Sequence, residues 1–134
     1  MQTTNIWVNG CFDILHIGHI ELLKYAKSLG NRLTVGIDTD DRVKQSKGPS
    51  RPFNSLQDRK NFLESIRYVD AVVSYSTDKE LEYELKENKI DIMVIGSDWK
   101  NKRVVGEKVV KKVVFFDRIG EYSTTKILNN EICI

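Results

Sequence analysis

Short apolar runs alternate with amphipathic segments along this chain. The runs are rich in Val, Ile and Leu and predict β-strands at residues 6–8, 32–37, 70–74, 91–95 and 113–116. Between them, apolar residues recur at helical spacing, which predicts helices at residues 20–29, after Ser55, and at 79–89, 104–112 and 123–130. Most of the runs are apolar throughout, and this favours a parallel sheet that helices cover on both faces.

Capping residues and helix breakers set the expected ends of several helices. Gly30 ends the first helix at the usual C-terminal position. Residues 38–41 follow the second strand and can cap a short helix. Residues 44–54 contain a Gly-Pro pair and a second proline, which predict a loop. Ser55 is expected to cap the next helix, with Asp58 in the place of the longer acid of a capping box.

The alternation of strands and helices predicts a doubly wound, Rossmann-like α/β fold. We expect a five-stranded parallel sheet in the order 3-2-1-4-5, with the strand at residues 6–8 in its centre, and a single domain over residues 1–134. No internal repeat, low-complexity segment or linker interrupts this pattern. Ligands of such sheets bind beyond the carboxyl ends of the strands, where the strand order reverses. The residues that follow the first strand are therefore the first candidates for a site.

The composition narrows the classes of function. The chain has 134 residues, of which 40% are hydrophobic and 30% charged, which is typical of a globular domain. Its net charge of +2 gives no sign of nucleic-acid binding through a basic face. No signal peptide precedes the first strand and no apolar run approaches the ~20 residues that span a membrane, so we expect a cytoplasmic protein without a membrane partner. Cys11 and Cys133 are expected to be free thiols.

The two histidines of the chain stand between the first strand and the first helix. Asn9-Gly10 breaks the strand, and His16 and His19 stand just before the helix. A helix N-terminus offers free N–H groups that bind phosphate, and Gly18 allows a phosphate close to the backbone. The imidazoles could instead bind a metal, but no further ligand at zinc spacing stands nearby. Packing of His16 and capping by His19 is the purely structural alternative, and the spacing favours a phosphate site.

Residues 10–19, Gly-Cys-Phe-Asp-Ile-Leu-His-Ile-Gly-His, resemble the signature of the HxGH nucleotidyltransferase superfamily and, within it, the cytidylyltransferase family. Three further segments are similar to segments of glycerol-3-phosphate cytidylyltransferases: RYVD at 67–70, GSDW at 96–99 and RIGEYSTTKI at 118–127. The matches follow the family's order over nearly the whole chain. The loop KGPSRPFN at 47–54 is instead similar to heptose-1-phosphate adenylyltransferases.

The resemblance implies that the protein transfers a nucleotidyl group. In this family a phosphate oxygen of a small phosphorylated substrate attacks the α-phosphorus of a nucleoside triphosphate, and pyrophosphate leaves without a covalent enzyme intermediate. His16 and His19 are implied to be catalytic, together with a lysine of the basic loop, for which Lys44 matches slightly better than Lys47. The resemblance also implies Mg²⁺ bound with the triphosphate, and a homodimer. It assigns no metal-ligating residue.

Further site residues carry over from the resemblance position by position. Those implied to bind the nucleotide are Gly10, Cys11, Phe12, Gly18, Asp98, Arg118, Ser123, Thr124 and Thr125. Those implied to bind the phosphorylated substrate are Asp13, Arg59, Arg67 and Trp99. Other interpretations stay open for some of them: a solvated basic loop for the lysines, a dimer interface for Arg67, and a buried structural role for Trp99.

The family resemblances disagree on the substrates. Trp99 and Arg118 side with the cytidylyltransferases, so we expect transfer from CTP to a small phosphorylated alcohol similar to glycerol 3-phosphate. The loop at 47–54 sides with the alternative, an ATP-dependent adenylyltransferase that acts on a sugar phosphate such as heptose 1-phosphate. A non-catalytic nucleotide-binding module is the alternative from another class, and the intact His16 and His19 argue against it.

Overall fold

The central element of the fold is β1 (Asn5–Gly10), which lies in the middle of a parallel sheet. The computed structural model describes residues 3–117. Within this range the sheet has five parallel strands in the order β3-β2-β1-β4-β5, which confirms the predicted topology. The other strands are β2 (Arg32–Asp38), β3 (Ala71–Tyr75), β4 (Ile92–Gly96) and β5 (Lys112–Phe116). The helix predicted at residues 123–130 lies outside the described residues.

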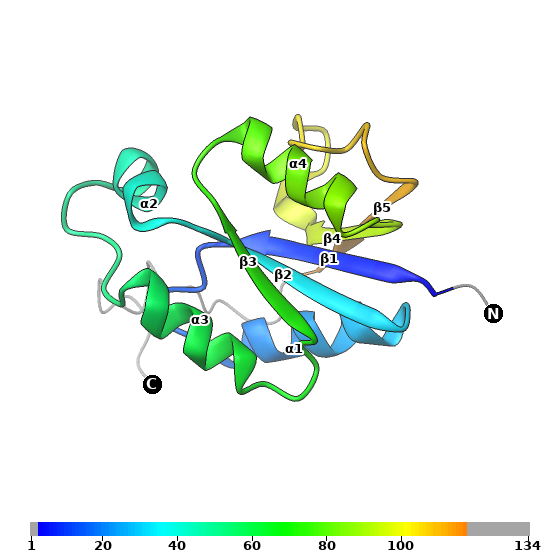
Figure 1. Cartoon of the computed structure of the whole chain (residues 1–134), viewed down its shortest axis with the longest axis horizontal. Coiled ribbons are helices and arrows are strands. Elements are labelled where there is room, and N and C mark those ends of the chain that lie inside the picture. Colours follow the sequence, from blue (N-terminus) through cyan, green and yellow to red (C-terminus); the bar gives the residue numbers. More distant parts are fainter. Residues whose placement is uncertain (1–2, 118–134) are drawn as a thin grey trace.

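The helices lie on both faces of the sheet, as a doubly wound fold requires. α1 (Ile17–Ser28) and α3 (Leu56–Glu64) pack on one face, and α4 (Asp78–Glu87) packs on the other (Figure 1). α2 (Asp40–Lys47) and the 3₁₀ helix η1 (Ser97–Trp99) follow the carboxyl ends of β2 and β4. Among the described residues, no helix has the length and apolar character needed to cross a membrane.

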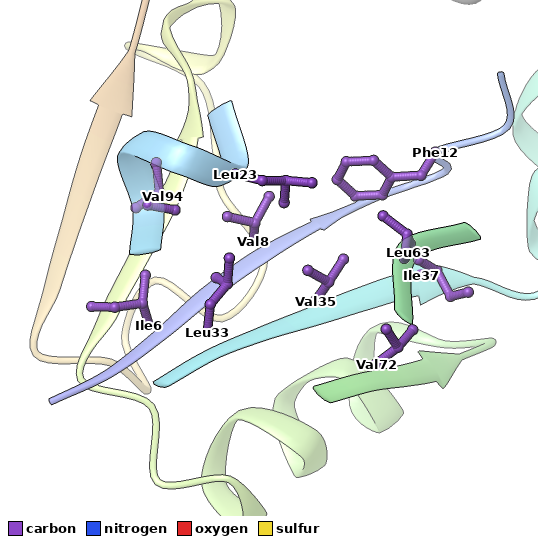
Figure 2. Packing of buried hydrophobic residues seen from close by; sticks show 11 residues of the cluster. Ile6, Val8, Phe12, Leu23, Leu33, Val35, Ile37, Leu63, Val72 and Val94 are labelled. Carbon is purple, nitrogen blue, oxygen red and sulfur yellow. The ribbon is translucent and has the colours of Figure 1, made fainter. Parts of the chain in front are cut away.

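Side chains of β1 alternate between two hydrophobic cores, one on each face of the sheet. Ile6 and Val8 belong to the first core, with Leu23 of α1 and Leu63 of α3 (Figure 2). Trp7, which lies between them in β1, is fully buried in the second core with residues of β3 and α4. Because both faces of the sheet are buried, the strands lack the polar alternation of a half-exposed sheet, which explains their continuous apolar runs.

Gly36 of β2 makes room for two aromatic side chains of the second core. A Cβ atom on Gly36 would lie 2.2 Å from Cζ2 of Trp7 and 3.0 Å from Cε1 of Tyr75. The two rings therefore approach the backbone of β2 more closely than any side chain there would allow. The ring of Trp7 in β1 and the ring of Tyr75 at the end of β3 thus lie near each other over β2, with their centroids 6.5 Å apart.

The predicted loop at residues 44–54 begins later than expected, because α2 continues to Lys47. Thr39 caps this helix, accepting a hydrogen bond from the backbone N–H of Arg42. Acidic residues lie in its first turn and basic residues in its last, an arrangement that the helix dipole favours. The first true helix breaker is Gly48, which has a φ of 103°. The glycine and prolines that predicted the loop begin only at residue 48, so they do not interrupt the helix before it.

The helix predicted at residues 104–112 is wrong. The structure has a series of turns there, followed by β5, which begins at Lys112. Its backbone bonds join residues three apart, such as the N–H of Glu107 with the carbonyl of Val104. Gly106 has a φ of 85°, and a Cβ atom there would lie 2.3 Å from Cδ1 of Leu85. The valines of this segment therefore pack against α4 from turns rather than from a helix.

Candidate functional site

A cavity of about 700 Å³ lies at the carboxyl ends of β1, β2 and β4. This is where the strand order reverses, and its size suits a small-molecule ligand. The predicted site residues that line it are Gly10, Cys11, Phe12, His16, Gly18, His19, Lys47, Asp98 and Trp99. The predicted residues Arg118, Ser123, Thr124 and Thr125 lie outside the described part of the chain.

His16 and His19 form a reciprocal cap at the N-terminus of α1. The Nδ1 atom of His16 accepts the backbone N–H of Gly18 at 3.1 Å, and the backbone N–H of His16 donates to Nδ1 of His19 at 3.2 Å. The two rings stack with their centroids 3.9 Å apart. Both residues still line the cavity, so the capping and phosphate-binding interpretations are compatible.

These backbone contacts determine which nitrogen of each histidine a ligand can use. An Nδ1 atom that accepts a backbone N–H carries no proton of its own. In the neutral rings of His16 and His19 the proton is therefore on Nε2. Each ring offers one N–H donor, held by the first turn of α1, at a helix end where backbone N–H groups and the helix dipole also favour an anion.

Gly18 lines the cavity, as a glycine that admits a phosphate should, and it also leaves room for the imidazole ring of His16. A Cβ atom on Gly18 would lie 2.9 Å from Cε1 of the His16 ring. Gly10 has a similar relation to Phe12, since its Cβ would lie 3.3 Å from the Phe12 ring. Phe12 has a φ of 50° and is 5% exposed, and its ring lies 5.2 Å from that of His19. Both glycines thus allow ring positions that support the histidine pair.

Asp13 lies beneath the cavity and holds the loop that follows α2. It is 1% exposed, and its carboxylate accepts the backbone N–H groups of Phe53 and Asn54 at 2.7 and 2.8 Å. Its Oδ2 atom also lies 3.3 Å from Nε of Arg51. Asp13 does not line the cavity, so its observed contacts organise the loop instead of reaching a substrate.

Arg59 is implied by the resemblance to bind substrate, but its side chain is fully buried and does not line the cavity. Its Nη1 atom donates to the carbonyls of Cys11 and Asp38 at 3.0 and 2.7 Å. Its Nε atom donates to the carbonyl of Asn54, and Nη2 to the carboxylate of Asp40. One guanidinium group thus connects the loops after β1 and β2 with the segment before α3. Arg59 positions the walls of the cavity.

The structure distinguishes the two candidate lysines. Lys47, at the last turn of α2, lines the cavity. The Nζ atom of Lys44 donates to the carbonyl of Arg51 at 3.1 Å, and Lys44 is absent from the lining. The geometry favours Lys47, whereas the resemblance slightly preferred Lys44.

Trp99 and Arg67 lie in different surroundings. Trp99 is 48% exposed and lines the cavity, so it is not a buried structural residue. Arg67 is exposed, and its guanidinium contacts only the neighbouring Tyr68 among the interactions described. The structure does not bring Arg67 to the cavity, and its interpretation as an interface residue stays a prediction.

The cavity wall also holds polar residues that were not predicted to be site residues. They are Asn9, Asp38, Arg42, Ser46 and Tyr75. Asn9, Asp38 and Tyr75 stand at or near the carboxyl ends of three strands, and that position was the available signal. Polar residues commonly follow apolar runs, so this signal is weak for any single residue. Only the strand order indicates that the three residues meet.

The chemistry of the site is that of binding and orientation. Burial raises the pKa of the Cys11 thiol, so it stays protonated and is a poor nucleophile at neutral pH. Within residues 3–117, no three His, Cys, Asp or Glu side chains gather to hold a metal ion. Mg²⁺ bound to a triphosphate needs few protein ligands, since phosphates and water supply most of its coordination. The Asp98 carboxylate in the wall is compatible with such a nucleotide-bound ion.

Comparison with known proteins shows which family the sequence matches. The family model described as cytidylyltransferase-like matches residues 7–130. The bifunctional protein HldE of Helicobacter hepaticus is 44% identical over 129 residues, which is 96% of this chain and 27% of the relative. The bifunctional protein HldE of Campylobacter fetus is 44% identical over 126 residues, 94% of this chain and 27% of the relative. The chain thus spans about a quarter of the length of these curated relatives.

Solved structures resemble the chain in fold. A lipopolysaccharide core biosynthesis protein from Thermoplasma volcanium matches with a TM-score of 0.67 and 24% identity, over 91% of this chain and 100% of that one. A pantoate–β-alanine ligase from Francisella tularensis, crystallised with an ATP compound and β-alanine, matches with a TM-score of 0.63 and 18% identity, over 94% of this chain and 68% of that one. At these identities the likeness extends to the fold alone.

Proposed function

Because this chain belongs to the cytidylyltransferase-like family of nucleotidyltransferases, we propose that it transfers AMP from ATP to a sugar phosphate such as heptose 1-phosphate, releasing pyrophosphate. The relatives named HldE support this choice, as does the loop at residues 47–54. They favour the ATP-dependent alternative over the expected transfer from CTP to a glycerol-3-phosphate-like alcohol. The match covers one part of proteins named bifunctional, and we assign the chain one of their activities.

The observation that carries this function is the stacked pair His16 and His19 at the N-terminus of α1. Their Nδ1 atoms are occupied by backbone N–H groups, so each ring presents Nε2–H as a donor. Donors fixed in this way stabilise the charge that grows on the phosphate oxygens of a transition state, and they need no rearrangement during the reaction. A triphosphate that meets the end of α1 is also favoured by the helix dipole.

The reaction itself needs no covalent enzyme intermediate. A phosphate oxygen of the sugar phosphate attacks the α-phosphorus of ATP, and the bond from that phosphorus to the oxygen bridging to the β-phosphorus breaks. The attacking oxygen is already an anion, so no general base is required. Lys47 supplies a positive charge in the cavity wall, and the half-buried Cys11 thiol, which stays protonated, is not needed as a nucleophile. Mg²⁺ bound to the triphosphate neutralises charge on the departing pyrophosphate.

A pyrophosphate-release assay tests the proposal. The chain is incubated with ATP or CTP, each with heptose 1-phosphate, other sugar phosphates or glycerol 3-phosphate, in the presence of Mg²⁺. We expect the highest kcat/KM with ATP and a sugar phosphate. Faster release with CTP and glycerol 3-phosphate would restore the cytidylyltransferase interpretation. Tight nucleotide binding without release from any pair would identify a non-catalytic binding module.

A further inference from the structure

The half of the cavity next to β2 and β3 is lined by a cluster of polar side chains, Asn9, Asp38, Arg42 and Tyr75. The sheet register explains why they meet. Asp38 and Tyr75 are direct partners in the pairing of β2 with β3, and Asn9 is paired with Gly36 of β2. His16 and His19 line the same cavity from the N-terminus of α1, which follows β1.

Contacts within the cluster determine the orientation of its groups. The indole N–H of Trp7 donates to Oδ1 of Asn9 at 2.9 Å, so the amide NH₂ group of Asn9 is the end left to interact with the Tyr75 phenol. Burial and the Asp38 carboxylate, with which the phenol forms a hydrogen bond, raise the pKa of Tyr75, so the phenol keeps its proton and donates it to Asp38. Gly36 permits this arrangement, since a side chain there would displace Trp7 and Tyr75.

Arg42 forms an ion pair with the carboxylate of Asp38. Its Nε atom lies 3.3 Å from Oδ1 of Asp38, while Nη2 donates to Asp78 at 2.9 Å and Nη1 to the carbonyl of Ser76 at 3.3 Å. The guanidinium also lies over the Tyr75 ring, 5.1 Å from its centroid. Arg42 is thus held by several partners and supports Asp38. The carboxylate side chain is 17% exposed and borders the cavity.

The chemistry of this cluster differs from that of the histidine end. Beyond these contacts, the Asp38 carboxylate can accept further hydrogen bonds, the Asn9 amide has a second N–H and the Tyr75 oxygen has a second lone pair, so together they match the paired donor and acceptor character of hydroxyl groups. The negative charge of Asp38 disfavours a phosphate at the same place.

We infer that Asn9, Asp38 and Tyr75 form the subsite for the sugar hydroxyls of the acceptor, with Arg42 as a positioning residue for Asp38. The inference rests on the proposed function and adds the acceptor's placement to it. The acceptor lies with its ring over the ends of β2 and β3 and its phosphate toward His16, His19 and Lys47. Selection among phosphorylated alcohols is then made at β2 and β3, away from the nucleotide.

The variants Tyr75→Phe and Asp38→Asn test this subsite in the full chain. Each removes one hydrogen-bonding function and preserves shape, and we expect the KM for heptose 1-phosphate to rise about 10-fold with little change in the KM for ATP. Tyr83→Phe is the matched control, since Tyr83 is 59% exposed and lies on α4. Monodeoxy derivatives of the sugar phosphate add a second measurement. For the derivative that lacks the contacted hydroxyl, we expect wild type and Tyr75→Phe to have the same KM. A merely structural role of Tyr75 does not produce this equality.

The outcomes separate this inference from the proposed function. Unchanged acceptor KM values in both variants, with normal turnover, overturn the subsite and leave the adenylyltransferase function in place. Equal rises in the KM for ATP and for acceptor, with a lowered melting temperature, assign the cluster a structural role and also overturn it. If the wild-type chain transfers AMP to none of the sugar phosphates, the proposed function fails and the subsite fails with it.

Discussion

The guanidinium of Arg59 donates a 3.0 Å hydrogen bond to the carbonyl oxygen of Cys11, a residue of the loop between β1 and α1. The same Nη1 atom donates to the carbonyl of Asp38 at the end of β2. Two walls of the cavity are therefore held at a fixed separation by one atom. The side chain that performs this task is fully buried in the described part of the structure.

Arg59→Met is expected to destabilise the protein by about 3–5 kcal/mol. The substitution leaves the carbonyls of Cys11 and Asp38 without this donor and removes the partner of the Asp40 carboxylate. Urea unfolding at equilibrium measures the free energy of unfolding. Arg67→Met is the matched control, because Arg67 is exposed, and it should change stability by less than about 0.5 kcal/mol. Equal effects of the two substitutions would contradict the role given to Arg59.

Replacing either histidine by alanine should affect catalysis far more than folding. His16→Ala and His19→Ala are each expected to lower kcat by about 100-fold or more, the scale of losing one preorganised donor. Each also removes part of the cap of α1, which costs about 1 kcal/mol. Thermal melting and steady-state kinetics on the same samples separate the two effects. Near-normal turnover in both variants would refute the catalytic role of the pair.

Lys47→Ala and Lys44→Ala form a matched pair on one helix. Lys47 lines the cavity, so its removal should lower kcat/KM by at least about 10-fold through loss of a positive charge near the phosphates. Lys44 donates to a carbonyl of the neighbouring loop, and its removal should change kcat/KM by less than about 3-fold. The pyrophosphate-release assay measures both. A larger loss for Lys44→Ala would show that the resemblance identified the correct lysine and that the geometry did not.

Gly36→Ala should strain the packing of Trp7 and Tyr75. The added methyl would lie 2.2 Å from Cζ2 of Trp7, and such overpacking costs about 1–3 kcal/mol. Gly96→Ala is the control, because a Cβ atom on Gly96 would have no atom within 4 Å beyond its chain neighbours. The melting temperatures of the two variants give the comparison. A melting temperature of Gly36→Ala equal to that of Gly96→Ala would show that the indole can move away without loss.

The order of the strands was predictable because it depends on a repeated local pattern. Each apolar run is long enough to form one strand of a sheet that is buried on both faces. The rules for connections between parallel strands then allow only a few strand orders. The prediction for residues 104–112 failed for a reason that lies outside the segment. Its valines have helical spacing, but Gly106 adopts a positive φ and lies against Leu85, a contact from a distant helix that no local pattern contains.

The histidine pair was predictable from its spacing, and the functions of Asp13 and Arg59 were not. Both residues carry a charge, and charged side chains are usually exposed. Their partners are backbone groups of distant segments, such as the carbonyl of Cys11 for Arg59 and the N–H of Asn54 for Asp13. Backbone groups leave no signature in a sequence. Tyr75 and Asp38 were missed because only the sheet register makes them neighbours.

The place of β1 in the sheet has a consequence for the order of events during folding. β1 pairs with β2 on one side, and on the other Ile6 is paired with Ile92 of β4. Pairings between such distant segments form slowly, because a long loop must close first. The histidine segment precedes Arg59 and β4 in the sequence, so it is synthesised before the guanidinium and the strand that support it. A nascent chain that ends before Arg59 carries the whole histidine motif and lacks the contacts that give it a binding shape.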